Sequence, residues 1–68
     1  MSGTVTINGR SVDILPDMTM AGLLESLGYD IRRIAVEIDG EICPRSELPA
    51  TAPVDGNRIE VVSFVGGG

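Results

Sequence analysis

Three consecutive glycines, Gly66, Gly67 and Gly68, close the sequence, and they are its best candidates for chemistry. A free carboxylate on Gly68 would stand on a stalk that has no side chains. Because glycine lacks a Cβ, such a stalk can adopt backbone angles closed to other residues and can enter a narrow channel. The run predicts a C-terminus that reacts inside another protein. The alternative is an ordinary frayed end, which is common at chain termini.

The residue types on which many hydrolases and metalloenzymes depend are missing. The 68 residues include no His, no Trp and no Lys, and Cys43 is the single cysteine. A Ser-His-Asp or Cys-His arrangement is therefore excluded, as are the common zinc ligand sets. A chain this short also leaves little room for a ligand pocket of roughly 300 Å³. We expect a protein on which other enzymes act, without a bound cofactor or metal.

The charge balance indicates which partners are unfavourable. Five Arg against ten Asp and Glu give a formal net charge of -5, and an acidic chain repels phosphate backbones. No signal peptide is recognisable, and the apolar stretches are far shorter than the roughly 20 residues of a membrane span. We expect a monomeric, cytoplasmic domain that binds neither nucleic acid nor a membrane.

Cys43 is a candidate for carrying sulfur, but its surroundings favour another role. It lies in a short strand pattern, without a His in the chain and with Arg45 as its one basic neighbour. A free cysteine in a strand is usually a small apolar filler, and we interpret Cys43 in this way.

The first part of the chain predicts a hairpin followed by a helix. Alternating residues on both sides of Asn8-Gly9, a favoured pair for a type I′ turn, indicate a β-hairpin over residues 3–14. Thr19 is the expected helix N-cap, with Asp17 as the competing cap. Gly28 is expected to end the helix. The apolar face of this helix, which we expect in the core, consists of Met20, Leu23, Leu24 and Leu27.

Two strands are predicted after the helix. Residues 34–38 form an apolar run that is expected in the interior of a sheet. Asp39-Gly40 is a second hairpin turn, and it leads to a short strand over residues 41–43. Pro44 lacks an N–H donor, so it should end this strand or mark it as an edge strand.

The last part of the chain predicts a loop and a final strand. Residues 44–57 are rich in proline and loop-like, and Asp55-Gly56-Asn57 is a turn signal. Residues 58–62 form the last strand, with Ile59 and Val61 on one face.

The order of these elements predicts an α+β fold. One main helix should cover one face of a mixed sheet of four to five strands, because both must bury an apolar side. The first and last strands are expected side by side in the middle of the sheet. This architecture is the β-grasp, or ubiquitin-like, fold. We expect one such domain over residues 1–63 and a flexible tail over residues 64–68 that carries the reactive carboxylate.

Five stretches, in this order and spacing, are similar to a known family. They are residues 5–9, 20–27, 34–42, 44–45 and 55–62, followed by the glycine run. Together they make the whole chain resemble the ThiS family, the small sulfur carriers of thiamine biosynthesis. There are two departures: Asn57 stands where the family commonly has Asp, and the loop over residues 48–53 is unusually rich in proline.

The resemblance implies a chemistry for Gly68. An E1-like adenylyltransferase of the ThiF type would use ATP to convert the Gly68 carboxylate into a glycyl adenylate. A cysteine desulfurase or another persulfide donor would supply sulfur, which leaves Gly68 as a thiocarboxylate (1-thioglycine). Thiazole synthase would then receive the sulfur for the thiazole ring of thiamine. Whether an acyl disulfide or a thioester to the E1-like enzyme forms on the way stays open.

The residues before Gly68 have supporting roles in this hypothesis. Gly66 and Gly67 give the backbone access to a partner's active site, where a side chain would clash. Phe64 and Val65 are candidate partner contacts, because exposed aromatic residues near an interface often carry binding energy. For Phe64 the alternative is that it folds back over the end of the sheet.

The sequence leaves other functions open. Within carriers of the same fold, the alternatives are the small subunit of molybdopterin synthase and the carriers for cysteine biosynthesis or tRNA thiolation. Outside that class, they are a plain β-grasp interaction module and a modifier joined to lysines of other proteins. Because the chain has no Lys, polymers of the chain on itself are disfavoured.

Overall fold

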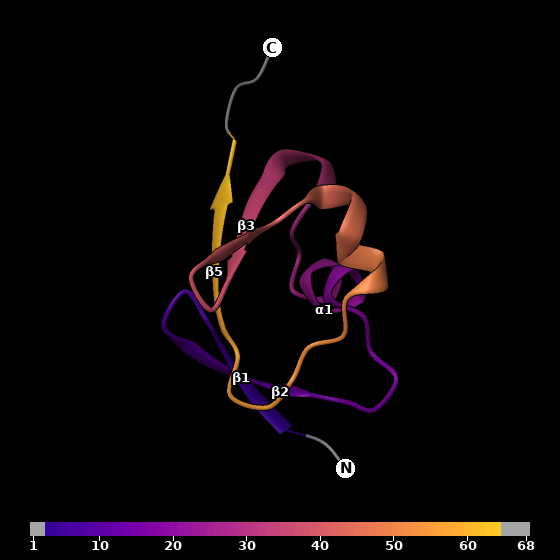
Figure 1. Cartoon of the computed structure of the whole chain (residues 1–68), viewed down its shortest axis with the longest axis vertical. Coiled ribbons are helices and arrows are strands. Elements are labelled where there is room, and N and C mark those ends of the chain that lie inside the picture. Colours follow the sequence, from indigo (N-terminus) through magenta and orange to yellow (C-terminus); the bar gives the residue numbers. More distant parts are fainter. Residues whose placement is uncertain (1–2, 65–68) are drawn as a thin grey trace.

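The computed structural model describes residues 3–64, and residues 1–2 and 65–68 lie outside the described part. Within residues 3–64, five strands form a mixed sheet in the order β2-β1-β5-β3-β4, and α1 lies against one face of it (Figure 1). This is the predicted β-grasp architecture. In chain order the elements are β1 (Gly3–Ile7), β2 (Arg10–Ile14), α1 (Met20–Ser26), η1 (Ile31–Arg33), β3 (Ile34–Ile38), β4 (Glu41–Cys43), η2 (Arg45–Ala50) and β5 (Arg58–Ser63), where η marks a 3₁₀ helix.

The first and last strands lie side by side, as predicted. β5 lies between β1, to which it is parallel, and β3, to which it is antiparallel. β3 is an interior strand flanked by β5 and β4, which confirms the position expected from its apolar run. β5 begins at the predicted residue and extends to Ser63, one residue further than expected. Its end lies at the opposite end of the molecule from the start of β1 (Figure 1).

Both hairpin turns form where the sequence predicts them. Asn8 and Gly9 have φ angles of 49° and 84°, and Asp39 and Gly40 have φ angles of 53° and 88°. A type I′ turn requires positive φ at both central residues, which Asn, Asp and Gly tolerate best. The local sequence therefore sets the register of β1 with β2 and of β3 with β4.

The helix begins as predicted but is shorter than its apolar stripe. The Thr19 Oγ1 accepts a hydrogen bond of 3.0 Å from the Gly22 N–H, so Thr19 and not Asp17 is the N-cap. Gly28 follows the C-cap with a φ of 94°, as expected. The expectation that Leu27 lies in the core is wrong. Leu27 is itself the C-cap, beyond the last helical residue Ser26, and 44% of it is exposed.

The core lies between α1 and the inner face of the sheet. Met20, Leu23 and Leu24 are buried from the helix, and Ile59 and Val61 are buried from β5, as predicted. Within residues 3–64 no polar or charged side chain is buried. The other buried residues are Val5, Ile7, Ile14, Ile34, Val36 and Leu48.

The loop predicted over residues 44–57 contains more structure than expected. Pro44 ends β4 as predicted, but η2 follows it immediately and buries Leu48. The Thr51 carbonyl accepts a 2.7 Å hydrogen bond from the Met20 N–H, which joins the end of η2 to the start of α1. Three prolines obscured this element in the sequence, because a 3₁₀ helix of six residues has no apolar period that could outweigh them. The turn at Asp55-Gly56 forms as predicted.

Candidate functional site

The candidate site is the end of β5, from which the glycine run continues. The predicted site residues Val65, Gly66, Gly67 and Gly68 lie outside the described residues. Phe64 is the last described residue. The structure therefore describes the contacts that hold and surround the base of the tail.

Backbone hydrogen bonds anchor the end of β5 to β3. The register continues to Ser63, which is opposite Ile34. One residue further, the Phe64 N–H donates a 2.7 Å hydrogen bond to the Arg33 carbonyl. The chain is thus fixed up to its last described residue.

On its other side, β5 is held by a side chain. Beyond Ile7 and Ile59, β1 turns away into the hairpin and no longer pairs with β5. The amide of Asn8 takes over: its Nδ2 donates to the Val61 carbonyl at 3.1 Å, and its Oδ1 accepts from the Val61 N–H at 2.8 Å. The side chain replaces the peptide group that a longer β1 would have offered. In the sequence, Asn8 carries no signal for this role beyond its turn preference.

Arg33 is positioned by η1, which Asp30 caps. The Asp30 Oδ1 accepts from the Arg32 N–H at 3.0 Å and from the Arg32 Nε at 3.2 Å. Asp30 Oδ2 also lies 3.6 Å from the Arg33 Nε. The hydrogen bonds from the side chain and backbone of Arg32 hold the pKa of the Asp30 carboxyl below its ordinary value, and the carboxylate in turn raises the pKa of Arg32. These exposed ion pairs order the turn more than they stabilise the fold.

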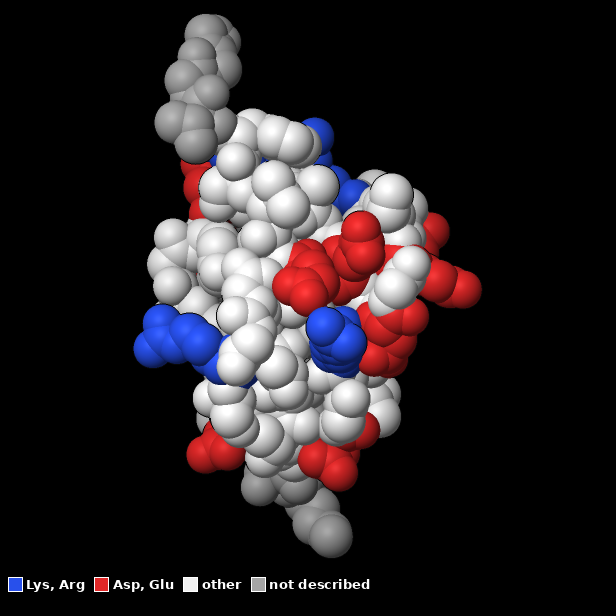
Figure 2. Space-filling view, turned by 90° about the vertical axis from the view of Figure 1, so that its left-hand side faces the viewer, with Lys and Arg blue, Asp and Glu red and all other residues white. Residues whose placement is uncertain are grey.

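A group of three arginines, which we call the basic group, lies near the base of the tail. Arg45 extends from η2 and donates from Nη1 to the Arg32 carbonyl at 2.8 Å. Three of the five arginines of this acidic chain, Arg32, Arg33 and Arg45, thus gather at one end of the molecule. Figure 2 shows basic atoms near this upper end. This group was not predicted, although the adjacent pair Arg32-Arg33 is visible in the sequence.

The face of the sheet that α1 leaves uncovered carries exposed apolar side chains. Val62 is 60% exposed and stands opposite Ala35, which is also exposed. Ile42, on the neighbouring edge strand, is 75% exposed. Phe64 is 54% exposed and lies outside the core, so it does not fold back to be buried against the sheet end. We refer to Ala35, Ile42, Val62 and Phe64 as the apolar patch.

Acidic residues lie next to the apolar patch on the same face. Glu37 of β3 stands opposite Glu60 of β5, and Arg58 Nε lies 3.8 Å from Glu60 Oε1. Glu37, Asp39, Arg58 and Glu60 line a shallow hollow. Figure 2 shows acidic side chains around a basic one in the middle of this face. The face thus offers a negative surface beside an apolar one, with the base of the tail above both.

Cys43 agrees with its interpretation as a filler. It is half-buried and packs against the core. Its Sγ lies 3.8 Å from Thr51 Oγ1.

Asn57 shows what the departure from the family pattern does. Its Nδ2 donates to Asp39 Oδ2 at 2.7 Å, and its Oδ1 accepts from the Val54 N–H at 2.7 Å. The other oxygen of Asp39 accepts from the Arg58 N–H, also at 2.7 Å. An Asp at this position could keep the bond from Val54 but would face Asp39 without a donor. The amide therefore joins the second hairpin turn to the start of β5.

Among residues 3–64 no helix is long and apolar enough to cross a membrane. The same residues contain no group of three or more side chains suited to hold a metal ion.

The fold and the site define a class of protein, a small β-grasp domain whose last strand lies at the centre of the sheet and ends beside an exposed apolar patch. Comparison with known proteins identifies the family. The model of the ThiS family matches residues 5–68, and the chain belongs to this family.

Two solved structures from Geobacter metallireducens are similar over nearly the whole chain. The crystal structure of a thiamine biosynthesis protein (ThiS) has a TM-score of 0.72 and 29% sequence identity, and covers 96% of this chain and 99% of that one. The NMR solution structure of a thiamine biosynthesis protein has a TM-score of 0.74 and 32% identity, and covers 96% of this chain and 87% of that one.

Similar sequences also occur within much longer proteins. A thiazole synthase of Paramagnetospirillum magneticum is 42% identical over 64 residues, which are 94% of this chain and 20% of that protein. A thiazole synthase of Magnetococcus marinus is 33% identical over an equal length. The chain thus spans about a fifth of the length of these thiazole synthases. The uncharacterized protein ycf40 of Porphyra purpurea, of similar size to this chain, is 29% identical over 65 residues.

Proposed function

We propose that this chain is a sulfur carrier of thiamine biosynthesis and that Gly68 is its reacting residue. The observation that carries the proposal is the match to the ThiS family over residues 5–68, which includes the whole glycine run. The two solved structures of thiamine biosynthesis proteins support the same pathway. The chain would be a substrate of its partners and would not itself be the catalyst.

The proposed chemistry begins with activation of the Gly68 carboxylate. A carboxylate is a poor electrophile, because its charge is delocalised and oxide does not leave. An oxygen of the Gly68 carboxylate attacks the α-phosphorus of ATP on an E1-like adenylyltransferase of the ThiF type, and pyrophosphate leaves. The glycyl adenylate that results carries AMP as a good leaving group.

Sulfur then replaces one oxygen. The outer sulfur of a persulfide, supplied by a cysteine desulfurase or another donor, adds to the Gly68 carbonyl carbon, and AMP leaves with the oxygen. The product is an acyl disulfide between Gly68 and the donor cysteine. A thiol attacks the sulfur of the donor cysteine, forms a new disulfide with it and releases Gly68 as the thiocarboxylate. Thiazole synthase takes the sulfur from this thiocarboxylate.

The anchored end of β5 supports this route. The last described residue, Phe64, is held by the hydrogen bond from its N–H to the Arg33 carbonyl. Four residues follow Phe64, up to and including Gly68, and four residues span at most about 14 Å. The carboxylate could therefore enter an active site at this depth while the folded domain stays outside. Gly66 and Gly67 would let the backbone pass through a channel too narrow for side chains.

The apolar patch would contact the partner around the mouth of that channel. Val62 and Phe64 lie at the base of the tail, Ala35 stands opposite Val62, and three of the four members are more than half exposed. Exposed apolar residues grouped in this way mark interaction surfaces. Phe64 is the member nearest to the tail, and Val65 would extend the contact.

Thiazole synthase is the acceptor that we favour among the carrier alternatives. Polypeptides named thiazole synthase contain a stretch 42% and 33% identical to nearly this whole chain. Two activities joined in one polypeptide commonly act on each other's products. This observation favours the thiazole branch over the acceptors of molybdopterin, cysteine or tRNA thiolation carriers.

Intact-protein mass spectrometry tests the proposal. The chain is incubated with ATP, a ThiF-type enzyme and a persulfide donor. We expect a mass increase that equals the exchange of one oxygen for one sulfur, and fragmentation should locate it at Gly68. A matched variant without Gly67 and Gly68 should show no increase. If the adenylyltransferase modifies another carrier in the same assay but leaves this chain unchanged, the proposed activation is wrong.

A further inference from the structure

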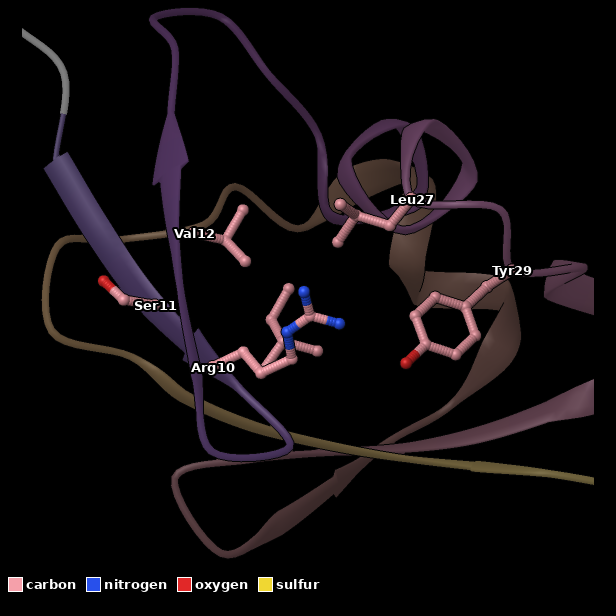
Figure 3. A pocket seen from close by; sticks show the side chains of 6 residues that line it. Arg10, Ser11, Val12, Leu27 and Tyr29 are labelled. Carbon is pink, nitrogen blue, oxygen red and sulfur yellow. The ribbon is translucent and has the colours of Figure 1, made fainter.

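A hollow lies between β2 and the end of α1, away from the candidate site (Figure 3). Its volume is about 170 Å³, below the roughly 300 Å³ at which small-molecule sites begin. It therefore has room for one large side chain rather than for a cofactor. The residues that line it are Ile7, Arg10, Ser11, Val12, Leu27 and Tyr29.

Among the described residues 3–64, β2 forms a free edge of the sheet beside this hollow. β2 pairs with β1 and ends the sheet order on this side. Ile7 and Arg10 flank the two-residue turn and form a hydrogen-bonded pair. In an antiparallel ladder such pairs alternate with pairs whose backbone groups point away from the partner strand. The N–H and C=O groups of Ser11 and Asp13 therefore point outward. Such a row of unpaired groups is a template for another strand.

The side chains of β2 connect the free edge to the hollow. Arg10 and Val12 lie two residues apart and share the face that looks toward α1, with Val12 partly buried. Figure 3 shows Val12 and Leu27 on one side of the hollow, and the Arg10 guanidinium extending toward Tyr29 on the other. A strand added at Ser11 and Asp13 would direct every second side chain into the same space.

The charge in the hollow indicates what such a strand should carry. Arg10 is the only charged residue among those that line it. Within residues 3–64 Arg10 takes part in no ion pair, whereas Arg32, Arg33 and Arg58 each lie within 4 Å of a carboxylate. An acidic side chain on the added strand would complement it.

We propose that the free edge of β2 and the hollow beside it bind an extended segment of a partner protein. A large apolar side chain of the segment fills the hollow against Val12, Leu27 and Tyr29. An acidic side chain two residues away pairs with Arg10, because residues i and i+2 of a strand point to the same face. Backbone bonds to Ser11 and Asp13 hold the segment in place.

This surface is separate from the site at the end of β5. The sheet order places β1 between β2 and β5, and the apolar patch lies on the face opposite to the one that α1 covers. A partner segment on β2 would therefore leave the tail free to enter an enzyme. The proposal does not depend on the sulfur chemistry. A second copy of this chain is a poorer occupant, because two chains of charge -5 repel each other.

NMR titration of the ¹⁵N-labelled chain with a synthetic peptide tests the proposal. The probe is acetyl-Thr-Leu-Thr-Glu-Thr-amide, in which Leu and Glu stand two residues apart, for an antiparallel strand. Acetyl-Thr-Glu-Thr-Leu-Thr-amide serves for the parallel direction. With one of the two we expect the largest amide shifts at Ser11 and Asp13, together with shifts at Leu27 and Tyr29.

Variants separate the two contacts. Arg10→Ala should raise the Kd of the Glu peptide up to about fivefold, as expected for an exposed ion pair, and should leave the Kd of the same peptide with Gln unchanged. Leu27→Gln should raise the Kd of both peptides about tenfold, since an apolar contact is lost. Leu15→Gln is the matched control: Leu15 is more exposed than Leu27 and does not line the hollow, so the Kd should not change.

Three results would overturn the inference. The first is the absence of shifts at Ser11 and Asp13 with both peptides at millimolar concentration. The second is a Kd that Leu27→Gln leaves unchanged while the variant keeps the wild-type spectrum. The third is concentration-dependent broadening of the same amides without peptide, which would assign the edge to a second copy.

Discussion

The two hydrogen bonds between the Asn8 side chain and Val61 give the sharpest prediction for stability. Replacing Asn8 by Gly keeps a residue that tolerates the φ of 49° and removes both bonds, of 2.8 and 3.1 Å. Each such bond contributes about 1 kcal/mol, and the partly buried Val61 groups would lose their partner. We expect the free energy of unfolding to fall by about 2 kcal/mol.

Asn8→Ala extends the series. Ala also lacks the bonds, and it adds the cost of a left-handed backbone, about 1–2 kcal/mol for a residue with a Cβ. We therefore expect a loss of about 3 kcal/mol, larger than that of Asn8→Gly. For a small domain with a total free energy of unfolding of about 5 kcal/mol, such a loss would leave about 2 kcal/mol and would raise the unfolded fraction to about 3%.

Urea unfolding followed by circular dichroism gives these free energies, and hydrogen exchange gives a local readout. In Asn8→Gly the Val61 amide should exchange faster by more than global destabilisation explains, because its acceptor is gone. If the free energy of unfolding of Asn8→Gly lies within about 0.5 kcal/mol of the wild-type value and the exchange rate of the Val61 amide is unchanged, the Asn8 side chain does not hold β5.

Four further outcomes are expected. Gly67→Val should abolish adenylation, measured by exchange of pyrophosphate into ATP, without a change in Tm; an unchanged rate would contradict the narrow channel. Asn57→Asp should lower the free energy of unfolding by about 1–2 kcal/mol at neutral pH, because the donor to Asp39 is replaced by a second carboxylate; urea unfolding that shows no loss would refute this. The pKa of the Asp30 carboxyl is lowered in the folded state, so its contribution to stability is present above the ordinary value of 3.8 and is lost as the pH falls through the lowered pKa; unfolding measured against pH should show a shallower acid dependence in Asp30→Ala, and identical curves would exclude the contribution. Leu48→Ala should cost about 3 kcal/mol, as for a buried leucine in a core, and a loss under 1 kcal/mol would mean that η2 can collapse onto α1.

Local chemistry explains which elements the sequence predicted correctly. Asn8-Gly9 and Asp39-Gly40 set their turns through positive φ, and Thr19 begins the helix through its own side chain. These signals act over two to four residues, so no knowledge of the rest of the fold is needed. The requirement that both helix and sheet bury an apolar side predicted one helix over one face of the sheet, and the apolar run over residues 34–38 predicted an interior strand.

The features that the sequence did not reveal depend on contacts distant along the chain. The Asn8 amide meets Val61 across 53 positions, and the burial of Leu48 requires α1 to lie above η2. Leu27 matches the helical period but lies beyond the last helical turn, so periodicity alone misplaced it. The basic group at the base of the tail is likewise assembled from two separate segments, one of which contributes Arg45.

The position of β5 has a consequence for biosynthesis. Of the five described strands, the one that fills the middle of the sheet is the last to leave the ribosome, and the two hairpins β1–β2 and β3–β4 can form before it. Without β5 the hairpins share no strand between them, and the core lacks Ile59 and Val61. A chain cut short during translation would therefore be unfolded and open to proteolysis. Only a chain translated through β5 can therefore carry the glycine run on a folded domain.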